Sequence, residues 1–175
     1  MRMKLLQIGA LVAVLGVLSA SSDAEPDIRT AQSLVQSVRA GIARRTLKVR
    51  HRTFEYCEPY ADTKRTIVLD RDDRVRMYER QAGSEDSSLT WAHYYDRNEC
   101  IRLVDITAKR VNGTVLRHRI YFNEAGKRIR EEHRYTKGPR HTFPAVWPVE
   151  DLQLRGAAEA FAAASPCPEV RSDVK

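Results

Sequence analysis

Residues 100–122 read CIRLVDITAKRVNGTVLRHRIYF. Apolar and polar residues alternate on both sides of Asn112-Gly113, a dipeptide that tolerates the positive φ angles of a type I′ hairpin turn. We therefore predict two antiparallel strands, at 100–111 and 114–122, joined by a tight turn. In this register Thr107 lies opposite His118, and Asp105 is diagonal to His118 on the same face of the sheet.

A short motif extends this pattern in both directions. Two apolar residues, then Asp or Asn, a polar turn and an apolar residue flanked by Arg recur in 68–76, 94–102 and 121–130. Asp and Asn side chains bond their own backbone two residues on, which starts a turn, so turn chemistry alone can account for the motif. The predicted strands are 46–57, 64–70, 74–81, 88–96, 100–111, 114–123 and 127–136.

Helical patterns flank these strands. Between 27 and 45, apolar residues recur at three- and four-residue steps, which places them on one face of a helix. A second helix is predicted at 149–164, where Pro148 and many alanines favour helix, and a linker at 138–148 precedes it. The predicted fold class is α+β: an N-terminal helix and a C-terminal helix packed on a curved antiparallel β-meander of about seven strands.

The first 24 residues have the order of a cleavable signal peptide. Arg2 and Lys4 precede an apolar run from 5 to 18, and small polar residues follow up to Ala24. The run is too short to span a bilayer as a helix. We expect cleavage after Ala24, with Ala20 as the alternative, and a periplasmic or secreted protein without a transmembrane segment. The expected organisation is a single domain at 25–165 and a disordered tail at 166–175.

The chain has three cysteines, and an oxidising compartment favours a disulfide between two of them. The favoured pair is Cys57–Cys100, because both residues lie in predicted strands. The alternative is Cys57–Cys167, which would hold the tail on the sheet. The chain has no CxxC motif, which argues against a thioredoxin-type or cysteine-rich zinc site.

The net charge of +7 points to an anionic partner. Export makes nucleic acid a poor fit and leaves lipid headgroups, acidic polymers or an acidic protein. Arginines alternate along the last two strands, where guanidiniums on a flat sheet can bind carboxylate or phosphate groups. The predicted anion-binding surface consists of Arg117, Arg119, Arg128, Arg130 and Arg134.

Catalytic motifs are missing: the sequence has no HExxH, GxSxG or glycine-rich phosphate loop, and no cofactor is predicted. A weaker hypothesis groups side chains on one sheet face that suit metal binding or acid–base chemistry. Its members are Asp105, His118, Glu131 and His133. The grouping depends on register, since a three-residue loop with a bulge at Gly126 would instead pair Arg119 with Glu131.

Three functions are consistent with these patterns. The first is an exported, non-enzymatic binding protein for a protein, a lipid or an acidic polymer. The second is an inhibitor or immunity-type protein of a secreted enzyme, with an exposed loop at 82–88 as its probe. The third is a metal-dependent or acid–base enzyme that uses the four-residue cluster.

Overall fold

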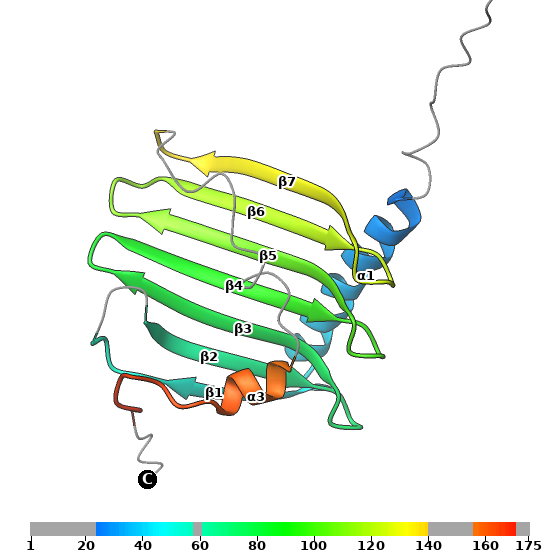
Figure 1. Ribbon diagram of the computed structural model, residues 1–175, viewed down its shortest axis with the longest axis horizontal. Helices are drawn as coiled ribbons and strands as arrows, with labels where there is room; N and C mark the ends of the chain where they lie inside the picture. Colours follow the sequence, from blue (N-terminus) through cyan, green and yellow to red (C-terminus); the bar gives the residue numbers. More distant parts are fainter. Residues whose placement is uncertain (1–23, 58–60, 140–155, 171–175) are drawn as a thin grey trace, which may run out of the picture.

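The structure is a computed structural model that describes residues 24–57, 61–139 and 156–170. Its centre is one antiparallel sheet of seven strands, in which every strand pairs with its neighbours in sequence (Figure 1). A helix lies on each face, α1 (Ala24–Ala43) and α3 (Ala157–Ala162). The strands are β1 (Lys48–Thr53), β2 (Asp62–Leu69), β3 (Val75–Ser84), β4 (Ser87–Tyr95), β5 (Ile101–Arg110), β6 (Val115–Phe122) and β7 (Arg128–Lys137). The predicted α+β fold is confirmed.

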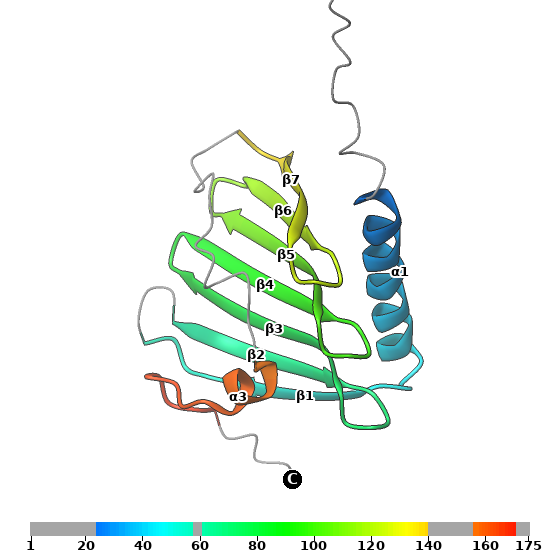
Figure 2. The same cartoon turned by 45° about the vertical axis from the view of Figure 1, so that its right-hand side comes forward.

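Helix α1 covers one end of its sheet face (Figure 2). Its buried residues follow the helical spacing seen in the sequence: Ile28, Ala31, Val35 and Val38. They pack on side chains from the ends of the strands: Val68, Met77, Ala92, Tyr94, Leu103 and Tyr121. We call this whole side of the sheet the α1 face. Its other half is not covered by any other described element.

The opposite face, which we call the α3 face, holds most of the remaining core. Helix α3 packs Ala157 and Phe161 on the β2–β4 part of the sheet, against Ile67, Tyr78 and Tyr95. Beside it, the central strands bury a second apolar cluster of Ala82, Trp91, Val104, Ile106, Ile120 and Phe122. The sheet is therefore apolar along one face and only half apolar on the other.

The turns after β2, β4, β5 and β6 share one construction. Each is a three-residue loop whose last residue has a positive φ, between 58° and 82°. Those residues are Asp73, Glu99, Gly113 and Gly126. The side chains of Asp70, Asp96 and Asn123 accept backbone N–H groups at the start of their turns. The recurring sequence motif thus reflects turn chemistry.

The predicted two-residue turn at Asn112-Gly113 is wrong, because only Gly113 of this pair has a positive φ. The extra loop residue shifts the register, so Ile106 lies opposite His118 and Thr107 opposite Arg117. A shift of one residue moves side chains to the other face of a strand. Asp105 therefore does not share a face with His118.

The favoured disulfide Cys57–Cys100 is also wrong. Cys57 follows β1 at one end of the sheet, whereas Cys100 lies in a turn at the other end. Cys57 bonds Cys167 instead, with the Cα atoms 5.5 Å apart, and Cys100 is a free thiol. The alternative pairing is the one observed.

The expected disorder of the tail is wrong for residues 166–170. This segment runs beside β1, where the Glu55 N–H donates to Pro168 O and the Val170 N–H to Thr53 O. The remaining residues, 171–175, lie outside the described part of the chain. So do the predicted signal peptide up to residue 23, most of the predicted 138–148 linker and the start of the second predicted helix.

The predicted loop at 82–88 is not a protruding loop. Strand β3 continues to Ser84 and β4 begins at Ser87, so Ala82 is buried within a strand. The inhibitor hypothesis stays a prediction without the feature that suggested it. Among the described helices, none has the length and apolar character to cross a membrane.

Candidate anion-binding surface

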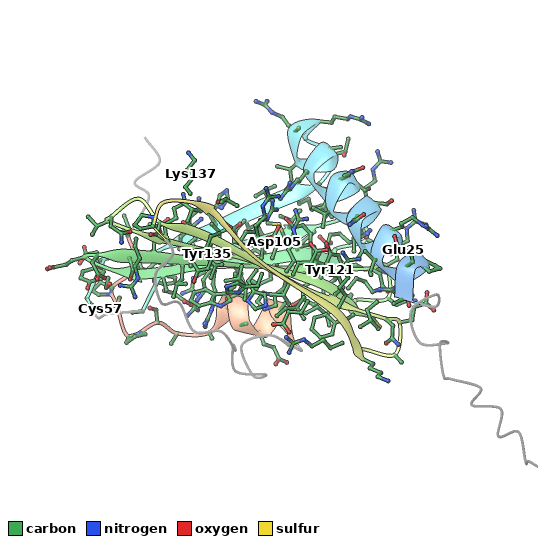
Figure 3. All side chains as sticks on the ribbon, turned by 90° about the horizontal axis from the view of Figure 1, so that it is seen from above. Glu25, Cys57, Asp105, Tyr121, Tyr135 and Lys137 are labelled. Carbon is green, nitrogen blue, oxygen red and sulfur yellow. A yellow bond between two sulfur atoms is a disulfide. The ribbon has the colours of Figure 1, made fainter. Side chains whose placement is uncertain are left out.

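The half of the α1 face that the helix leaves uncovered is polar. On β2–β6, strand alternation places on it the side chains that lie two, four or six positions along the strand from the α1-contacting residues. On β7, the observed register adds the side chains that pair with Tyr121, Arg119 and Arg117. We call this surface the polar face. Its members are Lys64, Thr66, Glu79, Gln81, Thr90, Asp105, Thr107, Lys109, Arg117, Arg119, Arg130, Glu132 and Arg134. Figure 3 shows labelled Asp105 and Lys137 on the same side of the sheet as α1.

Asp105 is the centre of the polar face. It is buried, with 6% of its surface exposed, in the middle of β5. The Arg117 Nε donates to its Oδ1 at 2.9 Å, and a second nitrogen of the same guanidinium contacts Oδ2. This bidentate pair fixes the orientation of Arg117, because two parallel bonds hold the guanidinium plane. The hydrogen bond also raises the pKa of Arg117, against the opposing effect of burial.

Two further guanidiniums approach the same carboxylate. Arg39, from α1, places a nitrogen 3.8 Å from Asp105 Oδ2, and the Arg119 Nε is 3.7 Å from that atom. One negative charge therefore faces three positive charges. The local excess of positive charge suits a second anion.

Toward the edge strand the positive charge continues. Arg130 pairs with Glu132 at 3.0 Å and approaches Glu25 of α1 at 3.8 Å, and the Arg134 side chain is exposed. Among the described residues of this surface, lysines and arginines outnumber carboxylates. With the contributions of α1, its cations are Arg39, Lys64, Lys109, Arg117, Arg119, Arg130 and Arg134, and its carboxylates are Glu25, Glu79, Asp105 and Glu132.

The structure brings four of the five predicted arginines onto one face. Arg128 is the exception. A bulge between Tyr121 and Phe122 sets Arg128 opposite Phe122, on the α3 face, where it forms an ion pair with Glu131. The bulge lies in a strand of ordinary composition, so the sequence offered no signal for it.

Arg39 is the contributor that sequence reasoning missed. It lies within the helix predicted at 27–45, and nothing in the sequence pattern placed it beside the arginines of the sheet. Its contact with Asp105 depends on the angle at which α1 crosses the sheet, which packing determines. Helical spacing identifies the buried side of α1 but not the strand beneath each residue.

On the α3 face, three of the four residues of the predicted His/Asp/Glu cluster come together. His133 lies opposite His118, with Nδ1 atoms 3.4 Å apart and ring centroids 5.1 Å apart. His118 Nε2 is 2.5 Å from Glu131 Oε1. We call these three residues the histidine cluster. Asp105 is on the opposite face, so the prediction is wrong for that residue.

Burial, together with the smaller effects of the neighbouring His133 and Arg128, lowers the pKa of His118 to about 4. His118 is therefore neutral at neutral pH, with one ring nitrogen protonated and the other carrying a lone pair.

A cleft of about 390 Å³ lies between the start of α3 and the turns after β4 and β6. Its lining combines apolar side chains such as Tyr95 and Ile101 with Glu99 and the free thiol Cys100. It was not predicted, since its walls come from parts of the chain that only the fold brings together.

The sequence was compared with models of protein families, with curated proteins and with solved structures, and none of the three comparisons gave a match. Within residues 24–57, 61–139 and 156–170, no three His, Cys, Asp or Glu side chains are arranged to hold a metal ion. The geometry of the chain itself therefore carries the functional argument.

Proposed function

We propose that this chain is an exported, non-enzymatic binding protein whose polar face binds an acidic polymer. The observation that carries the proposal is the group of three guanidiniums around buried Asp105. Arg117 is held in place before any ligand arrives, so a ligand does not have to immobilise a flexible side chain.

The shape of the surface supports a polymer rather than a small molecule. The polar face extends over several strands and is not enclosed, whereas small-molecule sites are concave and mostly apolar. Repeated carboxylate or phosphate groups could contact Arg117, Arg119 and Arg134 in succession along β6 and β7.

Export is part of the proposal. The N-terminal pattern predicts it, and the Cys57–Cys167 disulfide is typical of proteins outside the reducing cytoplasm. The buried residues of α1 begin at Ile28, so cleavage after Ala24 would remove only the partly buried Ala24 from the described helix.

The test is calorimetric titration with two polymeric probes, polyglutamate and inorganic polyphosphate, with uncharged dextran as the negative control. We expect binding to one or both polyanions and none to dextran. Affinity should fall steeply between about 0.1 M and about 1 M salt, because the screening length shortens from about 10 Å to about 3 Å.

A matched pair of variants locates the site. Arg119→Gln with Arg134→Gln removes two charges from the polar face, whereas Arg71→Gln with Arg97→Gln removes two exposed charges from turns at the end of the sheet. The first variant should bind at least about tenfold more weakly than the second. Equal loss in both would mean that net charge alone drives binding, and would contradict the proposal.

A further inference from the structure

The spacing of the two imidazoles in the histidine cluster suits a shared metal ion. A zinc ion lies about 2.0–2.1 Å from a histidine nitrogen, so two nitrogens at a tetrahedral angle around one ion are about 3.3–3.4 Å apart. The Nδ1 atoms of His118 and His133 are 3.4 Å apart. Adjacent, directly paired strands hold the two rings at this distance.

Glu131 supplies the outer contact that such a site needs. Histidines that bind metal commonly donate their other ring N–H to a carboxylate, which fixes the tautomer and increases the basicity of the ligating nitrogen. His118 Nε2 is 2.5 Å from Glu131 Oε1. With its proton on Nε2, His118 has the lone pair on Nδ1, the nitrogen beside His133.

The access of the site also favours a cation. His118 is 1% exposed, whereas His133 is on the edge strand and exposed, so an ion can arrive from solvent at His133. Arg128, a positive charge on the same face, is paired with Glu131.

We propose that His118 and His133 bind one zinc ion through their Nδ1 atoms, with Glu131 as the carboxylate that orients His118. Water occupies the remaining coordination positions. Without metal, His133 donates its Nδ1–H to His118; on binding, His133 changes to the Nε2–H tautomer, so no net proton is released. This site is on the opposite face from the polar face and does not depend on polymer binding.

The experiment is calorimetric titration of zinc into chelator-treated, disulfide-intact protein at about pH 7.5. The protein carries no polyhistidine tag, and Cys100→Ser removes the free thiol as a competing ligand. We expect one zinc ion per chain. His133→Gln should weaken binding at least about tenfold, and Glu131→Gln by about 10–100-fold.

The matched control is His51→Gln, which removes an exposed histidine of β1 on the other sheet face. It should leave zinc affinity unchanged. His133 is exposed, so its substitution should not disturb folding, and a circular dichroism spectrum checks this. Absence of zinc binding, or equal weakening in His133→Gln and His51→Gln, would overturn the assignment.

Discussion

Asp105 carries one carboxylate against three guanidiniums, and its removal should show whether it organises the polar face. Asp105→Asn leaves Arg39, Arg117 and Arg119 facing one another without a counter-charge. Breaking a largely buried ion pair in this way costs stability. We expect the free energy of unfolding to fall by about 1–3 kcal/mol, less than for a fully buried pair because the arginines are partly exposed.

Urea unfolding measures this effect, with the exposed turn substitution Glu85→Gln as its control. A loss no larger than the control's would show that Asp105 does not hold the arginines in place.

Asp70 predicts a pH dependence at the turn after β2. Partial burial raises the pKa of its carboxyl, but N–H groups of Arg74 and Asp72 and the Arg76 guanidinium outweigh this, and the pKa is below its usual value. A carboxylate with a lowered folded-state pKa stabilises the protein above its unfolded pKa of about 3.9, and this stability is lost as pH falls through the folded pKa.

Asp70→Asn should therefore reduce stability at neutral pH, and the difference from the parent should shrink as pH falls toward the folded-state pKa of Asp70. Unfolding curves measured between neutral pH and the folded-state pKa of Asp70 test this difference in stability. A difference that stays constant with pH would mean that the carboxylate charge plays no part in the turn.

At the scale of the element, α1 depends on a narrow apolar stripe. Val38 is 2% exposed and packs against the sheet, whereas Gln36 on the same helix is exposed. Val38→Ala removes two buried methyl groups and leaves a cavity, which should cost about 1–3 kcal/mol of unfolding free energy. Gln36→Ala should change stability by less than about 0.5 kcal/mol, and thermal unfolding compares the two. Equal effects would contradict the docking of α1 on the sheet.

The elements were predictable to different extents. Periodicity identified α1 and the seven strands, because burial of one side imposes a repeat of two or about 3.6 residues. The geometry of the turns was harder to predict from the sequence. Asn112-Gly113 fits a two-residue turn as well as the three-residue loop it forms, and that single residue determines which face Asp105 occupies.

At the scale of the whole molecule, the Cys57–Cys167 disulfide fastens the C-terminal segment to β1. The bond spans a sequence separation of 110 residues. Buried Arg65 adds hydrogen bonds to the carbonyls of Ala160 and Ala163 at the end of α3. The last part of the described chain is therefore joined to its first strands by both covalent and polar contacts.

Cys57→Ser with Cys167→Ser should lower the free energy of unfolding by about 2–4 kcal/mol, because the unfolded chain loses a long-range constraint. Hydrogen exchange should accelerate most in 156–170, since the segment loses its anchor. Cys100→Ser serves as the control and should change neither. Unchanged exchange in 156–170 would show that Arg65 and the β1 contacts suffice without the disulfide.

The candidate site was partly predictable at this scale. Alternation along β6 and β7 identified the arginines, and four of them share the polar face. Their arrangement around Asp105 could not be predicted, because it needs the register of β5 against β6 and the position of Arg39 over the sheet. Both depend on contacts between segments far apart in the sequence.

The most direct test of the proposed acidic-polymer site is chemical-shift mapping of the ¹⁵N-labelled protein during titration with polyanion. We predict that the perturbed amides cluster on β5–β7, around Asp105, Arg117, Arg119 and Arg134. Perturbations confined to the turns at 70–74 and 96–100, or spread evenly over all surface amides, would contradict a binding site on the polar face.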